Sequence, residues 1–249
     1  MFRIIFQAPK CVQESSYQPD PIFGPLSMTI LTCFALKEEA APFRKVAAAK
    51  PGVSILIVGI GRQNAEKSVR QFLATHSPEL VLTCGFAGGL DPDLKLGDVI
   101  FELGHRPSAI GHQSKPPHVG CHEKLIAAGA KPVRFHCADR IATTVAEKQA
   151  LRHQTGADAV EMESAAIQDV CRERGLACVT VRVISDAANE DLPLDFNALA
   201  KPDQSLDFGK LAWTVAKSPG KIGALLALQR KTRLAANQLA AVLAQVTFP

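Results

Sequence analysis

The sequence predicts an α/β fold in which a largely parallel sheet is buried between layers of helices. Short apolar runs alternate along the chain with segments of helical periodicity, and several of these runs end at glycine. The run at 177–184 (ACVTVRVI) lacks the alternation of a half-exposed strand, which is typical of a strand covered on both faces. A length of 249 residues suits one large domain of this class.

The expected elements follow one another from residue 28 onward, after an extension, residues 1–27, whose four prolines predict poor order. We expect strands at residues 28–35, 54–58, 80–84, 98–102 and 177–184. We expect helices at residues 63–76, 144–155, 159–174 and 221–246. Residues 28–249 should therefore form one domain that ends in a basic amphipathic helix.

Residues 103–123 fit neither pattern, because they contain three prolines and four histidines. The histidines are His105, His112, His118 and His122. A metal site, a loop at the active site and a plain surface loop all stay open as interpretations. The HxH and HExxH spacings of metal sites are absent, so we assign no metal ligand.

Composition and charge exclude several classes of protein. No apolar run approaches the roughly 20 residues that span a bilayer, and the N-terminus lacks the pattern of a secretory signal. The seven cysteines form no CxxC pair, which favours reduced thiols in a cytoplasmic protein. From Lys201 onward seven Lys and Arg face two Asp, so the formal charge of +4 is concentrated in the tail. The rest of the chain offers no net attraction to nucleic acid.

Segments that follow the expected strands carry residues suited to chemistry, and ligands of doubly wound sheets bind beyond the carboxyl ends of the strands. The first segment holds Glu38 and Glu39, which are either a solvated helix start or a catalytic acid. The second, Gly85-Phe86-Ala87-Gly88-Gly89, is either a tight turn into a helix or a cradle of N–H groups for an anion or hydroxyl. It is neither a P-loop nor a dinucleotide fingerprint.

Two further segments carry carboxylates. Glu161 and Glu163 lie at the expected start of a helix, where their spacing prevents them from sharing one face. We therefore expect one of them to face solvent and the other to face inward, where it could hold the vicinal hydroxyls of ribose. Asp186 follows the strand at 177–184 and is either placed for chemistry or a helix N-cap.

Together these segments resemble the nucleoside phosphorylase superfamily, particularly its methylthioadenosine/adenosylhomocysteine nucleosidase branch. The resemblance covers residues 28–200 and rests on ALKEEA (35–40), GIGRQNA (59–65), TCGFAGGLDPDLKLGDVI (83–100), AVEMESAAI (159–167) and VRVISDAANED (181–191). The later EDLPLDFNALAKPD and the basic C-terminal helix look most like the bacterial hopanoid-associated phosphorylase subgroup. The resemblance implies a three-layer αβα sandwich with a mostly parallel mixed central sheet, and an enzyme that cleaves the N-ribosyl bond of a purine, in particular adenine, nucleoside.

The same resemblance implies roles for individual residues. Asp186 matches the acid that protonates purine N7, Glu39 matches the group that activates the attacking water, and Arg182 lies beside that water. Glu163 matches the acceptor of the ribose 2′ and 3′ hydroxyls. Further substrate-binding positions are Met162 against the sugar, Ile141 and Ala142 against the base, and Glu161, Phe86, Gly85 and Ser185. These roles suit the reaction, because cleavage builds positive charge on the sugar and negative charge on the base.

Two positions depart from the family pattern. Phosphorolytic members commonly place Arg where this chain has Thr83, and the family usually has Ser or Thr where it has Phe86. Because both family residues contact phosphate, we expect water to be the nucleophile. The alternative is phosphorolysis with phosphate as co-substrate, including phosphorolysis of an adenosylhopane-like lipid nucleoside. An alternative of another class is a catalytically silent relative that binds nucleosides. The presence of Glu39, Glu163 and Asp186 argues against this alternative.

The expected partners are a small-molecule nucleoside and, by the same resemblance, further copies of the chain in a homo-oligomer. No cofactor, metal or nucleic acid is expected. The helix at 221–246 groups Arg230, Lys231 and Arg233. This basic group is either a solvated face or a weak contact with a membrane surface. We therefore expect a cytoplasmic protein, with peripheral membrane binding through this helix as the alternative.

Overall fold

The computed structural model describes residues 29–48, 50–103, 117–199 and 220–247, with isolated positions between 201 and 217. The N-terminal extension and most of the His-rich segment lie outside the described residues. The expectation of poor order for residues 1–27 therefore stays a prediction.

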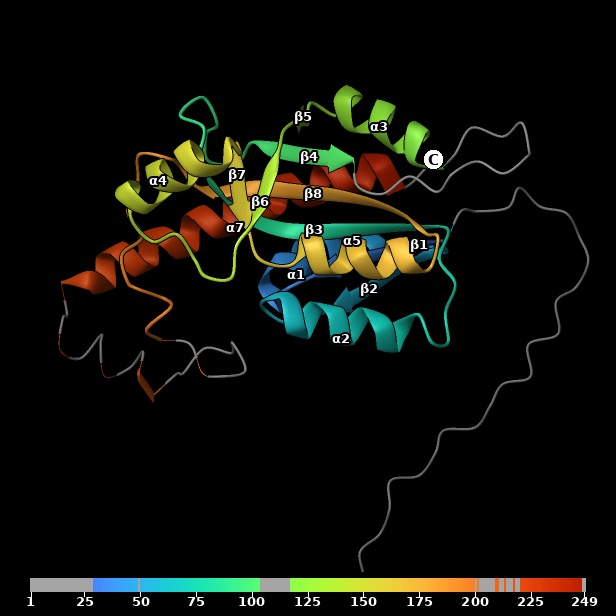
Figure 1. Ribbon diagram of the computed structural model, residues 1–249, viewed down its shortest axis with the longest axis horizontal. Coiled ribbons are helices and arrows are strands. Elements are labelled where there is room, and N and C mark those ends of the chain that lie inside the picture. Colours follow the sequence, from blue (N-terminus) through green and yellow to red (C-terminus); the bar gives the residue numbers. More distant parts are fainter. Residues whose placement is uncertain are drawn as a thin grey trace, which may run out of the picture.

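The centre of the molecule is an eight-stranded mixed sheet (Figure 1). Its strands are β1 (Ile30–Phe34), β2 (Val53–Ile57), β3 (Leu80–Gly89), β4 (Val99–Leu103), β5 (Lys131–Pro132), β6 (Phe135–Cys137), β7 (Ala159–Glu161) and β8 (Ala177–Asp186). The main order is β2-β1-β3-β8-β4-β5, and β7 joins the far end of β3 with β6 beside it. The pairs among β2, β1, β3 and β8 are parallel, whereas β4 runs antiparallel to β8. The predicted mostly parallel mixed sheet is confirmed.

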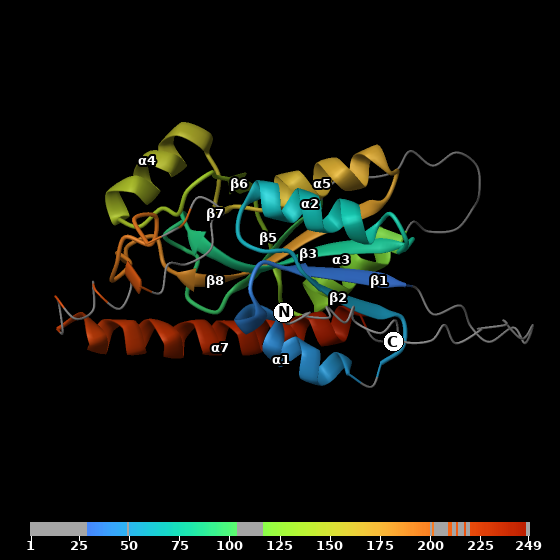
Figure 2. The same ribbon diagram turned by 90° about the horizontal axis from the view of Figure 1, so that it is seen from below.

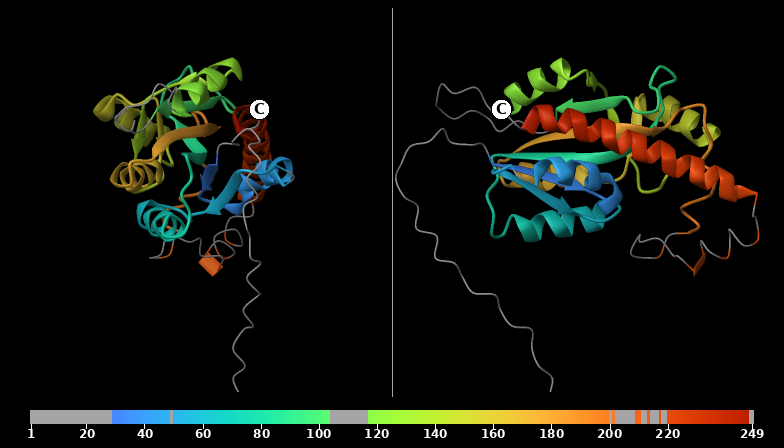
Figure 3. Two further views of the ribbon diagram at one scale, coloured as in Figure 1. Left: turned by 90° about the vertical axis from the view of Figure 1, so that its right-hand side faces the viewer. Right: turned by 180° about the vertical axis from the view of Figure 1, so that it is seen from behind.

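Helices cover both faces of this sheet, which makes three layers (Figures 2 and 3). One face carries α1 (Lys37–Ala47), α3 (Pro117–Ala127) and α7 (Lys221–Thr247), and the other carries α2 (Arg62–Phe72) and α5 (Ser164–Glu173). The remaining helix of the described chain, α4 (Val145–Thr155), lies beyond the end of β8. The first turns of α7 extend past the sheet (Figure 2).

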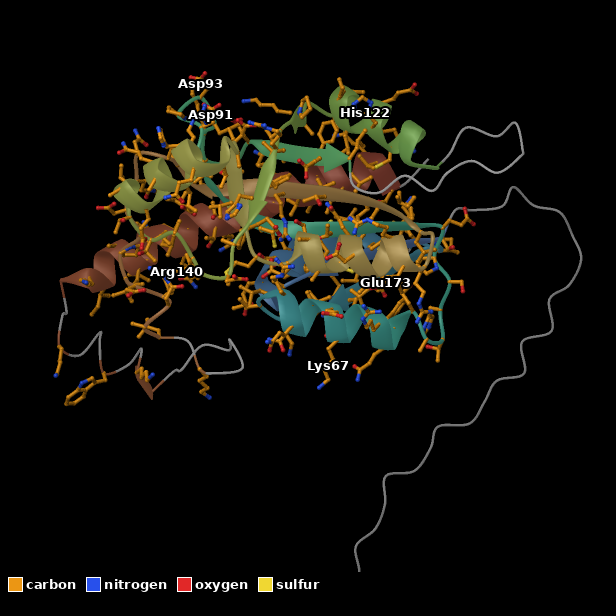
Figure 4. The ribbon with its side chains drawn as sticks, viewed as in Figure 1. Lys67, Asp91, Asp93, His122, Arg140 and Glu173 are labelled. Carbon is orange, nitrogen blue, oxygen red and sulfur yellow. The ribbon has the colours of Figure 1, made fainter. Side chains whose placement is uncertain are left out.

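The two helical layers bury both faces of the central strands. Leu80, Leu82 and Cys84 of β3 pack with α1 and α7, while Val81 packs with α2 and α5. All ten residues of β8 are buried. This double coverage explains why the strand sequences are apolar without alternation. On the α2 and α5 side, the exposed carboxylate of Glu173 at the end of α5 (Figure 4) accepts hydrogen bonds from Arg70 of α2.

Three predicted boundaries were wrong. β3 does not stop at Gly85, because pairing with β8 and β7 carries the strand on to Gly89. The expected helix at 159–174 is divided into β7 and α5, since the first three residues pair with β3 and β6. Residues 117–123, expected to be irregular, begin α3, where the ring of His122 packs edge-on against Phe101.

Candidate active site

A buried cluster of charged side chains lies where the parallel strands end. Glu39 comes from the first turn of α1, Glu161 from β7, Glu163 from the position before α5, and Arg182 from β8. All four side chains are almost fully removed from solvent. The sequence singled out each of them, and the fold brings them together from distant parts of the chain.

Arg182 holds the cluster together. Its Nη2 lies 2.5 Å from Glu161 Oε2 and 3.4 Å from Glu163 Oε2, and it also donates to Thr83 Oγ1 at 3.2 Å. Its Nη1 donates to the carbonyl oxygen of Cys84 at 3.2 Å. The guanidinium therefore ties β8 to both β3 and β7. Because an arginine keeps its charge in proteins, its burial would be costly without these carboxylate partners.

Glu161 is saturated by protein donors. Its Oε2 accepts from the backbone N–H groups of Glu163 and Ser164 as well as from Arg182, and its Oε1 accepts from Ser164 Oγ at 2.5 Å. Burial alone would raise the pKa of Glu161, but Arg182 and these hydrogen bonds outweigh it and lower that pKa. We therefore interpret Glu161 as the anchor of Arg182 and of the start of α5, and not as a substrate contact.

The orientation expected for Glu161 and Glu163 was wrong in one respect. Neither side chain faces solvent, and both face Arg182. The argument from helix faces fails because Glu161 ends a strand and α5 begins only at Ser164. The link between strand and helix turns both carboxylates inward.

Arg182 stabilises the ionised forms of Glu163 and Glu39 less than that of Glu161, relative to the cost of their burial. Burial raises the pKa of Glu163 to about 7, a rise that Arg182 opposes and Glu161 reinforces. Burial likewise raises the pKa of Glu39, against the opposing effect of Arg182. Glu163 accepts one hydrogen bond, from Gly61 N–H at 2.9 Å. Both carboxyl groups therefore have a raised pKa, about 7 for Glu163, which is a property of groups that do acid–base work.

Gly85 gives Glu39 and Arg182 room to approach each other. A Cβ at this position would lie 2.6 Å from Arg182 Nη1 and 2.9 Å from Glu39 Oε1, and the backbone has a φ of +146°. The next N–H, that of Phe86, donates to Glu39 Oε1 at 3.0 Å, while Leu36 N–H donates to its Oε2. The glycine-rich segment is thus a strand that admits large neighbours and not the tight turn that the sequence suggested, and its N–H at Phe86 binds the carboxylate of Glu39.

Asp186 ends β8, on the same edge of the sheet as the cluster. The pairing of β3 with β8 shifts between Ala87 and Gly88, so Ser185 is an extra residue in β8 and Asp186 lies opposite Gly88. Asp186 Oδ1 accepts from Ser185 Oγ at 2.7 Å, and Oδ2 lies 2.6 Å from Lys148 Nζ. Asp186 is buried and belongs to the strand, so it is not a helix N-cap.

Lys148 was missed by sequence reasoning. It stands in a helix rich in polar residues, where a lysine is normally solvated, and the sequence holds no signal that would bring it to Asp186. In the structure its side chain is fully buried.

The other predicted substrate positions lie in β3, in the link between β7 and α5, and between β6 and α4. Phe86 and Met162 are half-buried, and Phe86 packs against the core shared with α1 and α7. Ile141 and Ala142 lie between β6 and α4, where the side chain of Asn197 bonds both the N–H and the carbonyl of Ile141. Asn197, on the segment after β8, is a second residue that the sequence did not single out.

The cluster combines carboxyl groups suited to two tasks. Two buried carboxyl groups with raised pKa values can accept protons or hydroxyl hydrogen bonds, and a third carboxylate, Asp186, lies at the next strand end. Within the residues that the structure describes, no three His, Cys, Asp or Glu side chains converge as metal ligands. The arrangement favours proton transfer and sugar binding.

Comparison with known proteins agrees on one family. The model of the phosphorylase superfamily matches residues 37–107 and 120–216, well over half of the chain. A 5′-methylthioadenosine/S-adenosylhomocysteine nucleosidase of Shewanella halifaxensis is 30% identical over 161 residues, which cover 56% of this chain and 70% of that protein.

Solved structures share the fold at lower identity. The futalosine hydrolase of Helicobacter pylori superposes with a TM-score of 0.63 at 18% identity, covering 90% of this chain and 98% of its own. The 5′-methylthioadenosine/S-adenosylhomocysteine nucleosidase of Neisseria meningitidis, in complex with methylthio-immucillin-A, gives 0.62 at 18% identity, covering 88% and 97%.

The raised pKa of Glu163 predicts a pH-dependent effect of Glu163→Gln on stability. The contribution of Glu163 to folding is fully present below about pH 4.5 and is lost as the pH rises to about 7, because the folded state then resists an ionisation that the unfolded chain allows. The melting temperature of the variant relative to wild type should be higher at pH 8 than at pH 5, by at least about 2 °C.

Thermal unfolding followed by circular dichroism at the two pH values measures this effect. Glu173→Gln is the matched control, because Glu173 is exposed and Arg70 lowers its pKa, so its removal should cost stability at pH 8. An equal shift for Glu163→Gln at both pH values would contradict the account.

Proposed function

This chain belongs to the phosphorylase superfamily, and we propose that it is a nucleosidase that hydrolyses the N-ribosyl bond of an adenine nucleoside. The observation that carries the proposal is the buried set of Glu39, Glu163 and Arg182 beside Asp186, at one edge of the sheet. The resemblance to a nucleosidase named for two adenine nucleosides supports the choice of base.

On the sugar side, two carboxylates act. Glu163 in its ionised form accepts hydrogen bonds from the vicinal ribose hydroxyls, and Met162 packs against the ring. Glu39 orients the attacking water and takes its proton, for which a raised pKa makes it a stronger base. Both carboxylates also stabilise the positive charge that the sugar gains as the bond to the base breaks.

On the base side, Asp186 in its protonated form transfers its proton to N7 of the purine. The bond from C1′ to N9 breaks, and its electron pair goes to the base, which leaves as neutral adenine. Ile141 and Ala142 flank the base, and Phe86 lies toward the 5′ substituent. The water oxygen bonds to C1′, and the proton taken by Glu39 returns to Asp186 through solvent, so the cycle closes.

Charge favours water over phosphate as the nucleophile. Glu39, Glu161 and Glu163 surround the one guanidinium of Arg182, so a phosphate anion arriving beside Arg182 would meet an excess of negative charge, whereas neutral water would not. Thr83, at the position of a phosphate-binding Arg, is buried and accepts from Arg182. Phosphorolysis would need a further cation, such as Arg62 at the start of α2.

The first test is release of adenine from 5′-methylthioadenosine and adenosine, and its loss in Asp186→Asn. Asparagine keeps the shape of the side chain but has no proton of suitable acidity. We expect turnover to fall by at least about 100-fold, within the usual contribution of a general acid. Chromatography of free adenine measures the rate, and circular dichroism verifies the fold.

Asp195→Asn is the matched control, because Asp195 is exposed on the segment after β8 and bonds only to local N–H groups among the described contacts. Its turnover should stay within about twofold of wild type. A folded Asp186→Asn enzyme with near-normal turnover would rule out the acid assignment.

A lipid-linked nucleoside presented at a membrane surface is a second candidate substrate, favoured by the first turns of α7. Ile222 and Leu226 are exposed there, together with Leu234 farther along. Lys221, Arg230 and Arg233 are exposed on the same helix, and Lys231 pairs with Glu190. No helix of the described chain is apolar and long enough to cross a bilayer, so such contact would be peripheral.

Sedimentation with vesicles tests this second candidate. The protein should sediment with vesicles that contain phosphatidylserine at low salt, and less at high salt, because basic residues near an anionic surface contribute about 1 kcal/mol each. Arg230→Glu should weaken binding at least about threefold. Lys67→Glu, on the exposed side of α2 (Figure 4), should not. Equal binding to neutral phosphatidylcholine vesicles would dismiss the membrane contact.

A further inference from the structure

Lys148 is a fully buried lysine that the mechanism above does not use. It is the residue of the described helix α4 that is buried, and its side chain has no exposure to solvent. Its Nζ lies 2.6 Å from Asp186 Oδ2 and donates to the carbonyl oxygens of Ala187 and Glu190, each at 2.7 Å. Because burying a charged lysine is costly, these three contacts must compensate for the loss of its hydration.

The coordination of Lys148 suits an ammonium group. An ammonium group has three protons to donate and accepts nothing, and here three oxygen atoms lie within hydrogen-bond distance. Beside the ionised carboxylate of Asp186, all three protons of this group are used, and its position is fixed in three directions.

This ammonium fixes the carboxylate of Asp186. Oδ2 is held by Lys148, and Oδ1 is held by Ser185 Oγ, which also reaches the carbonyl oxygen of Ala87. The two anchors come from different elements, α4 and β8, so the plane of the carboxylate cannot turn without breaking one of them. Each oxygen keeps a second lone pair, which can bind the proton that Asp186 transfers to N7 in the proposed mechanism.

The same ammonium holds the turn that follows β8. Ala187 and Glu190 are joined by a backbone hydrogen bond of 3.2 Å, and Lys148 closes this turn onto α4. The side chain of Glu190 in turn pairs with Lys231 of α7. The turn after Asp186 thus connects β8 with α4 and α7.

We propose that Lys148 is a positioning residue for Asp186, a proposal that rests on the proposed function. Lys148 holds the carboxyl group of Asp186 in the direction of the base, and it neutralises the carboxylate that remains once the proton has moved from Asp186 to N7. The three protons of Lys148 stay in place throughout, so it transfers nothing and acts only through Asp186.

The proposal is tested with Lys148→Met, alone and combined with Asp186→Asn. In the wild-type background, kcat for adenine release from 5′-methylthioadenosine should fall by about 30-fold or more, with KM changed by less than about threefold. In the Asp186→Asn background the same substitution should change turnover by less than about threefold, because the residue through which it acts is already disabled. Single turnovers with excess enzyme measure the slow variants.

Two further variants keep the test decisive. Lys148→Gln replaces Lys148→Met if the latter does not fold, because its amide can still donate to the two carbonyl groups but carries no charge for Asp186. Lys131→Met is the matched control, since Lys131 makes an exposed ion pair of 2.7 Å with Asp98 at the sheet edge. The control should retain its kcat.

The outcomes distinguish failure of the role proposed for Lys148 from failure of Asp186 as the acid. Equal losses from Lys148→Met in both backgrounds would show that Lys148 only supports the turn, and an unchanged kcat would also overturn the proposal. If Asp186→Asn alone retains normal turnover, the acid assignment itself fails. If Asp186→Asn is slow while Lys148→Met is normal, only the role of Lys148 fails.

Discussion

The buried ion pair of Arg182 with Glu161 is the interaction on which the site depends. The ion pair places one positive charge inside the protein, next to the carboxylate of Glu161. Arg182 lowers the pKa of this carboxylate against the effect of burial. Arg182 compensates only in part for the burial of Glu39 and Glu163, and burial raises the pKa of both. Two carboxyl groups with raised pKa values thus lie beside the pair, in a region that excludes most water.

The backbone is arranged so that this pair can form. Arg182 lies opposite Gly85 in the register of β3 and β8, and any side chain at Gly85 would collide with the guanidinium or with Glu39. Three residues farther along β3, the shift in register places Asp186 opposite Gly88. The glycines of β3 therefore serve the site through the space they leave, and the strand continues through them because β8 and β7 pair with it on both sides.

Much of this could be predicted from sequence, because the signals were local. Apolar runs predicted the central strands, carboxylates after two of those runs predicted Glu39 and Asp186, and the carboxylates at an expected helix start predicted Glu163. The missed features depend on tertiary contacts. Lysine in an ordinary helix predicts a solvated side chain, yet Lys148 is buried on Asp186. Glycine-rich sequence disfavours a strand, yet pairing extends β3 through it. The sequence could not distinguish the roles of Glu161 and Glu163, because the fold brings Arg182 to Glu161 and turns Ser164 toward it.

The central claim is that the carboxylates around Arg182 favour water over phosphate as the nucleophile. Phosphorus-31 NMR of a reaction in phosphate buffer, with wild-type protein and 5′-methylthioadenosine, tests it most directly, with adenine followed in the same sample. The account predicts that adenine and free 5-methylthioribose accumulate at a rate independent of phosphate, and that no sugar 1-phosphate signal grows. A sugar 1-phosphate that forms in step with adenine, at a rate that rises with phosphate, would contradict the account.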